Sequence, residues 1–84
     1  MNTSCIHIYY SSWGWEIIYH SVNRLGDRVV NPVVGHVFHQ LRTAVEYAKR
    51  WRNIKEVYDW PIWIDRKSYH AQVRYQKYLE EKEA

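Results

Sequence analysis

The sequence predicts a single small α+β domain over residues 1–84, with its elements in the order β-β-β-α-β-α. We expect a small antiparallel sheet, one helix packed on a face of it and a second helix at the C-terminus. Three observations support this prediction. Residues 4–22 alternate apolar and other side chains around a glycine-containing loop, as in a β-hairpin. Residues 41–53 repeat apolar side chains at helical spacing. The length of 84 residues suits one domain.

The first predicted element is a hairpin of residues 4–10 and 15–22, joined by a four-residue loop, SSWG, whose glycine permits a positive φ. This loop places three apolar pairs on one face: Tyr10 with Trp15, Ile8 with Ile17, and Ile6 with Tyr19. It places three other pairs on the opposite face: Tyr9 with Glu16, His7 with Ile18, and Cys5 with His20. A shift by one residue would destroy this separation, so the pattern predicts the register as well as the hairpin.

A third strand is predicted within residues 28–38, which contain five valines. Pro32 has no N–H group to donate to a neighbouring strand. We therefore expect a short or irregular start and then a strand near residues 33–38, with Gly35 as a candidate bulge. The three strands would form an antiparallel meander.

The clearest helical period lies in residues 41–53. Its apolar members fall on one side of a helix: Leu41, Ala44, Val45, Ala48 and Trp51. Two starting points are open. Thr43 and Glu46 fit a capping box, which would leave Leu41 outside the helix. The apolar period instead favours a cap at His39 or Gln40, although both are weak capping residues. We prefer the longer helix.

The last third of the chain returns to an extended pattern and then predicts a second helix. Trp60-Pro61 indicates a kink, because a residue before proline avoids the helical region. Residues 57–58 and 62–64 form one broken strand or two short ones. Asp65 is the expected N-cap of a helix over residues 66–82. Tyr69 and Val73 form a narrow apolar stripe roughly opposite the main one on this helix.

Composition and charge limit the classes of function. The chain has five Trp and eight Tyr, more large rings than one small core needs. Its net charge is +3, and the excess of bases lies in residues 42–55 and 66–77, which favours an acidic partner. The one cysteine, Cys5, cannot form an internal disulfide, so a reducing cytoplasm is the expected location. We see no membrane-length apolar run and no N-terminal signal, so we expect no membrane association.

No motif for metal binding or catalysis is present. His36 and His39 have a useful ligand spacing only on a helix, whereas their segment has the pattern of strand and loop. Cys5 and His20 are expected to be cross-strand neighbours, but two ligands do not make a site. The chain contains no nucleophile elbow, phosphate loop or paired-carboxylate motif. We therefore predict no enzyme activity, no metal and no cofactor.

The remaining candidates for function are basic and aromatic side chains. Basic residues on the first helix would steer an acidic partner, and exposed rings would anchor it. The plainer alternative for the bases is a solvated helix face with pairs such as Glu46 and Arg50. For Trp60 and Trp63 we favour closure of the core, and for Trp13 exposure at the loop tip. The candidate partner-binding residues are Trp13, Arg42, Lys49, Arg50, Arg52, Trp60, Arg66, Lys67 and Tyr69.

The run FHQLRTAVEYA at residues 38–48 resembles a pattern in small bacterial and phage proteins, of which the DUF2188-like group is an example. In that pattern a meander ends in Phe, and a helix follows that begins with Leu and carries two Ala four residues apart. The resemblance covers about half of the chain. Gln40 stands where such proteins often have Ser or Thr, and the tyrosine-rich second helix is not part of the pattern. In general type, the chain is also similar to phage-encoded inhibitors such as anti-CRISPR proteins. The resemblance assigns no role to any residue.

These points predict a non-enzymatic binding protein, an inhibitor of phage or mobile-element type in the host cell cytoplasm. It would occupy an acidic surface of a host protein or ribonucleoprotein complex. The alternative is a small RNA- or DNA-binding module that uses the basic helix face, although no RNP strand motif or KH loop is present. Homodimerisation through the second helix is compatible with either prediction.

Overall fold

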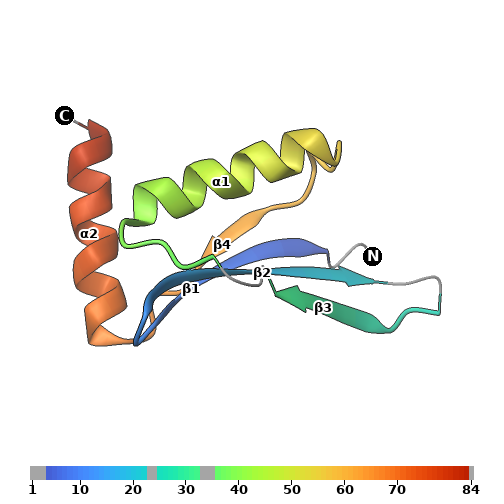
Figure 1. The fold of residues 1–84 in the computed structure, drawn as a ribbon, viewed down its shortest axis with the longest axis horizontal. Coiled ribbons are helices and arrows are strands. Elements are labelled where there is room, and N and C mark those ends of the chain that lie inside the picture. Colours follow the sequence, from blue (N-terminus) through green and yellow to red (C-terminus); the bar gives the residue numbers. More distant parts are fainter. Residues whose placement is uncertain (1–3, 23–24, 33–35, 84) are drawn as a thin grey trace.

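The computed structural model describes residues 4–22, 25–32 and 36–83. Its elements are β1 (Cys5–Ser11), β2 (Gly14–Val22), β3 (Arg28–Pro32), α1 (Leu41–Ile54), β4 (Ile62–Ile64) and α2 (Tyr69–Glu83). The strands form one four-stranded sheet in the order β3-β2-β1-β4. Helix α1 lies across one face of this sheet, and α2 stands at one end of it, steeply inclined to α1 (Figure 1). The predicted α+β class is confirmed.

The sheet is mixed, because β4 runs parallel to β1. Ile6 is in register with Ile62, and Ile8 with Ile64. Two backbone hydrogen bonds extend this pairing: Ile6 N–H donates to Pro61 O at 2.9 Å, and Asp65 N–H donates to Ile8 O at 2.8 Å. The expectation of an antiparallel sheet is therefore wrong for this strand. Its direction depends on the path of α1, which carries the chain back across the sheet to the free edge of β1 (Figure 1).

The hairpin has the predicted register in all six pairs between Cys5–His20 and Tyr10–Trp15. Ser11 and Gly14 pair with each other as well, so the loop itself contains only two residues. Gly14 adopts φ 137°. The glycine in this loop is thus required by the backbone, as the sequence suggested.

The third strand lies earlier in the chain than predicted. It ends at Pro32, which pairs with Ile18; of the predicted strand near residues 33–38, residues 33–35 lie outside the described residues, and within 36–38 only Phe38 takes part in a β-bridge. Gly35, the candidate bulge, falls outside the described residues. Phe38 forms an isolated bridge with Trp15, in which each residue donates its N–H to the other's carbonyl, at 2.8 and 2.9 Å. Pro32 suits the end of an edge strand because it has no N–H group to donate.

Helix α1 begins at Leu41, which confirms the longer helix, and Thr43 lies inside its first turn. The N-cap residue is Gln40, in an extended conformation and with no side-chain capping bond. The capping-box alternative is therefore wrong. The burial of Leu41 explains this choice, because starting the helix later would remove that side chain from the core.

Helix α2 begins at Tyr69, later than predicted, and Asp65 is not its N-cap. The Asp65 carboxylate accepts a hydrogen bond from Lys67 N–H at 2.9 Å and so closes a turn before the helix. The cap is Ser68, whose hydroxyl oxygen accepts from Ala71 N–H at 3.1 Å. Both residues are good capping types, and the sequence alone did not show which one starts the helix.

The core lies between the sheet and the two helices. Its buried side chains come from β1, β2, α1 and α2: Ile6, Ile8, Trp15, Ile17, Tyr19, Leu41, Ala44, Val45, Ala48 and Ala71. Stacked rings close the far end of α1. Trp51 stacks on Tyr19 with ring centres 3.7 Å apart, and Trp60 packs against Trp51 at 5.7 Å. The two small alanines of α1 let the helix lie close to the sheet.

Candidate interaction surfaces

The β1–β2 turn presents Trp13 to solvent. The Ser11 hydroxyl oxygen accepts a hydrogen bond from Trp13 N–H at 3.2 Å and donates to Gly14 O at 3.1 Å. These two bonds order the turn around the tryptophan, whose side chain is 78% exposed. An exposed ring on an ordered turn loses less conformational freedom on binding than a ring on a flexible loop. The expected exposure of Trp13 is confirmed.

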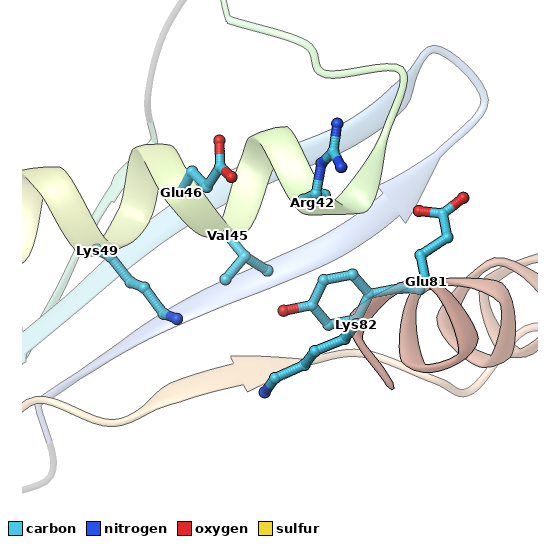
Figure 2. Close-up of a pocket in the computed structure, with 7 residues that line it drawn as sticks. Arg42, Val45, Glu46, Lys49, Glu81 and Lys82 are labelled. Atoms are coloured by element: carbon cyan, nitrogen blue, oxygen red, sulfur yellow. The ribbon is translucent and has the colours of Figure 1, made fainter. Parts of the chain in front are cut away.

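Two of the candidate bases of α1 line a groove against α2. Arg42 and Lys49 share this groove with Glu46 of the same helix. Figure 2 shows Glu81 and Lys82 of α2 extending beside them. The groove therefore carries side chains of both signs and is not a uniformly basic surface.

The other two candidate bases of α1 lie in different surroundings. Arg50 borders a shallow pocket with Tyr47, Trp51 and Ile54. Arg52 is half-buried and donates a hydrogen bond from Nη1 to Trp60 O at 3.0 Å. This bond ties the end of α1 to the segment that leads into β4. The structure therefore gives Arg52 an internal contact and distributes the remaining bases over more than one surface.

The two tryptophans near the kink have opposite environments. Trp60 is half-buried and packs against the core, in agreement with the favoured interpretation. Trp63 is 61% exposed, so the expectation that it closes the core is wrong. In β4, Ile62 and Ile64 pack against the core, and side chains alternate along a strand. This period of two in Ile62-Trp63-Ile64 is the signal that would have placed Trp63 on the opposite face.

Near α2, the remaining three candidates differ in exposure and contacts. The Arg66 guanidinium lies 4.9 Å from the ring centre of Tyr75, so a cation–π contact holds it against the helix. Lys67 is exposed in the turn before α2. Tyr69 is 75% exposed, and it borders a wide, open groove on the outer side of α2 that also includes Val73. The second apolar stripe predicted for this helix is thus exposed.

The sheet face opposite α1 carries a second group of aromatic side chains. We call this the open sheet face and define it by Cys5, His7 and Tyr9 of β1, Glu16, Ile18 and His20 of β2, and Trp63 of β4. Among the described residues, no helix lies on it (Figure 1). Register places Trp63, His7 and Ile18 side by side in one row across three strands. The His7 ring centre lies 6.2 Å from that of Tyr9 and 5.9 Å from that of His20.

Tyr9 and Glu16 make a polar contact at one end of the open sheet face. Partial burial, the neighbouring Glu16 carboxylate and a hydrogen bond to it raise the pKa of Tyr9. Like any tyrosine, Tyr9 is protonated at neutral pH, and its hydroxyl donates to the Glu16 carboxylate. Most of the open sheet face is uncharged or aromatic, which suits contact with another protein surface.

On the covered face, the buried hydroxyl of Tyr19 has no hydrogen-bond partner among the described residues. Burial and the nearby Tyr47 raise its pKa from 10.0 to about 12. The folded state therefore favours the neutral hydroxyl. The unfolding free energy of the protein has its full value below pH 10, and the contribution of Tyr19 to it is lost as the pH rises through about 12. We expect the wild type to lose about 2 to 3 kcal/mol of unfolding free energy over this interval relative to Tyr19→Phe.

This expectation is tested by urea unfolding of the wild type and Tyr19→Phe at several pH values between 8 and 12. At pH 8 the variant should be as stable as the wild type or slightly more stable, because it removes a buried hydroxyl without an acceptor. Identical pH profiles of stability for the two proteins would contradict the raised pKa of Tyr19.

Three further findings bear on function. Among the residues that the structure describes, no group of three or more His, Cys, Asp or Glu side chains is placed to hold a metal ion. Within the same residues, neither helix has the length and apolar character needed to cross a bilayer. Comparison with protein-family models, curated proteins and solved structures finds no match to this chain.

Proposed function

We propose that this protein is a non-enzymatic binding protein that acts by occupying a surface of a partner protein. The observation that carries the proposal is the exposure of four large rings outside the core: Trp13, Tyr58, Trp63 and Tyr69. Trp and Tyr are among the residue types most enriched at interface hot spots. A small domain gains no stability from exposing them, so contact with a partner is the simplest physical role.

The inhibitor type suggested by the resemblance to phage-encoded proteins forms part of this proposal. The partner would be a cytoplasmic host protein or ribonucleoprotein complex with an acidic surface. Exposed bases would accelerate the approach of the partner, and the exposed rings would hold it once bound. These bases are Arg42, Lys49, Arg50 and Lys67. Arg52 and Trp60 would contribute indirectly, because their hydrogen bond fixes the segment before β4. Arg66 would contribute its charge from beside Tyr75.

The second candidate is a small RNA- or DNA-binding module. The observation in its favour is the position of Arg50 beside the rings of Tyr47 and Trp51, since bases stack on such rings. The observation against it is the presence of Glu46 and Glu81 in the groove that holds Arg42. These carboxylates interrupt the run of bases that a nucleic-acid backbone needs, whereas a protein surface of mixed charge can match such a groove, so the protein partner is preferred.

An affinity pull-down from host lysate, with and without nuclease, distinguishes these candidates. One stoichiometric protein partner that survives nuclease supports the proposed function. Loss of every partner after nuclease treatment supports the nucleic-acid module instead. A steep fall in the affinity for free RNA or DNA as the salt concentration rises would also support the nucleic-acid module. Size-exclusion chromatography of the protein alone tests the remaining alternative, homodimerisation through α2.

Substitution of the exposed rings should separate binding from folding. Trp13 and Trp63 lie on different surfaces. We expect alanine in place of the ring that contacts the partner to weaken binding by about 2 kcal/mol or more. The unfolding free energy should change by less than about 0.5 kcal/mol, because neither ring is part of the core. Ile54→Ala, at an exposed side chain that is not aromatic, is the control and should bind like the wild type.

Charge reversal tests the steering. The triple change Arg42→Glu, Lys49→Glu and Arg50→Glu should reduce the association rate about tenfold or more at low salt, with a smaller effect at high salt. Unchanged association at low salt would exclude this electrostatic role, and unchanged affinity in both Trp variants would exclude anchoring by Trp13 and Trp63.

A further inference from the structure

The two edges of the sheet differ in how well they are protected against pairing with another strand. At one edge, β3 begins with Arg28 and ends with Pro32. A charged residue and a proline are two of the devices that keep a strand edge from pairing. At the other edge, β4 has β1 as its only neighbour among the described strands, and its sequence, Ile-Trp-Ile, contains neither device. The free edge of β4 is therefore a candidate for contact with a further strand.

The bonds between β4 and β1 show which backbone groups of β4 face this free edge. The C=O group of Pro61 and the N–H group of Asp65 are hydrogen-bonded to β1. Backbone groups of alternate residues in a strand point in the same direction, so those of Trp63 face β1 as well. The N–H and C=O groups of Ile62 and Ile64 thus point the other way. Among the described residues, these four groups have no backbone partner.

The arrangement of these four groups is complementary to itself. A two-fold axis perpendicular to the sheet, beside Trp63, places a second β4 antiparallel to the first. Ile62 then lies opposite Ile64 of the second copy, and the two residues exchange a pair of hydrogen bonds. The axis repeats this pair, so every free group of both strands is satisfied. A shift by two residues would place one isoleucine opposite a residue outside β4.

The exposed side chain of β4 fits the same register. Trp63, which is 61% exposed, would lie opposite Trp63 of the second copy in a pair without mutual hydrogen bonds. In such a pair the Cα atoms are about 4.5 Å apart and the side chains lie closest. Both rings would lie on the open sheet face, and cross-strand aromatic pairs stabilise a sheet. The row formed by Ile18, His7 and Trp63 would continue into the same row of the second copy.

The nearest exposed charges on the two sides of β4 differ in sign. Asp59 precedes the strand, and Arg66 and Lys67 follow it. Asp65 also follows it, but its carboxylate is engaged with Lys67 N–H at 2.9 Å. An antiparallel copy brings the acidic side of each strand to the basic side of the other, with residue 59 opposite residue 67. A parallel copy would bring like charges together, so the charges favour the antiparallel pair.

We propose that the protein forms a symmetric homodimer in which the β4 strands of two copies pair antiparallel about Trp63. The two four-stranded sheets join into one continuous sheet of eight strands, with both open sheet faces on the same side. Because β4 has only three residues, the contact is small, and the expected dissociation constant is about 100 µM. This pairing involves no other protein, so its test on the purified chain is separate from the test of the proposed function.

Sedimentation velocity of the purified full chain tests the dimer at concentrations from about 10 µM to about 1 mM. The protein should be mostly monomeric at the lowest concentration and mostly dimeric at the highest. Amide hydrogen exchange locates the contact, because the N–H groups of Ile62 and Ile64 should exchange about fivefold more slowly at the highest concentration. The N–H of Trp13, in the β1–β2 turn, is the control and should exchange at an unchanged rate. A monomer at every concentration, or a dimer without this protection, would overturn the proposal.

A lysine at the centre of the contact should oppose the dimer. Trp63→Lys places two positive charges opposite each other across the axis, so the dissociation constant should rise about tenfold or more. The fold should be retained because the ring is outside the core. Trp13→Lys makes the same change at an exposed ring in the turn and should dimerise like the wild type. Equal dimerisation of Trp63→Lys and Trp13→Lys would overturn the proposal.

Exchange of the flanking charges tests the register. Asp59→Lys and Lys67→Glu should each weaken the dimer about threefold or more, because each places like charges together. The chain with both changes restores opposite charges and should dimerise like the wild type. A loss that is as large in the double variant as in the single variants would overturn the register. A dimer that is lost in Val73→Lys but kept in Trp63→Lys uses the outer side of α2 and would overturn the proposal.

Discussion

Alanine in place of Gly14 is expected to destabilise the protein by about 3 kcal/mol, a combination of backbone strain and a forced contact. Gly14 has φ 137°, a conformation that residues with a Cβ atom rarely adopt. A Cβ atom at this position would lie 2.8 Å from Phe38 O and 2.9 Å from Val37 Cγ1. The first of these atoms is backbone and cannot move away cheaply.

The damage should extend beyond the turn itself. Phe38 O accepts the hydrogen bond from Trp15 N–H, so moving it breaks the bridge that brings the chain from β3 to α1. Equilibrium urea unfolding measures the effect. Gly26→Ala is the matched control, because Gly26 also has a positive φ of 84° but no atom within 4 Å of the added Cβ. It should cost only about 1 kcal/mol. A smaller effect at Gly14 than at Gly26 would refute the forced contact.

The substitution Ile8→Ala should reduce the unfolding free energy by about 3 to 4 kcal/mol. Ile8 is fully buried and lies in register with Ile17 of β2 and Ile64 of β4. The paired strands around it are fixed by backbone hydrogen bonds, so they cannot close the space that the lost atoms leave. The cost therefore includes the cavity as well as the lost burial.

The matched control is Ile54→Ala at the end of α1, since the same atoms are removed from a side chain that is 70% exposed. Its expected effect is within about 0.5 kcal/mol. Both variants can be compared by thermal and urea unfolding monitored by circular dichroism. Similar losses in the two variants would mean that the space around Ile8 closes after substitution, contrary to the packing described above.

Local patterns in the sequence determined the hairpin and the first helix. Alternation along two adjacent segments specifies which side chains face the core, and the short loop between them leaves one register that keeps the faces separate. The apolar period of α1 fixed its start at Leu41 against the capping-box signal, because burying that side chain outweighs a cap. The exposure of Trp13 followed from its place at the turn.

Several features of the candidate surfaces depend on contacts between residues that are distant in sequence. In the sequence, Arg52 looks like a solvent-exposed basic residue of a helix. Only the fold brings its guanidinium within hydrogen-bonding distance of Trp60 O. The sequence favours a place in the core for Trp63, whereas the pairing of β4 with β1 turns it to the open sheet face. A small pocket lined by Trp15, Leu41 and Arg74 joins β2, α1 and α2, and no local pattern in the sequence indicates it.

The α+β class, the β1–β2 register and helix α1 thus follow from local patterns, since each rests on a period within a continuous segment. Three features are visible only in the folded chain: the parallel direction of β4 relative to β1, the end of β3 at Pro32, and the set of bases that remain exposed. The physical reason is that these outcomes depend on the path of the chain across the sheet. That path is set by the packing of the whole core, to which every element contributes.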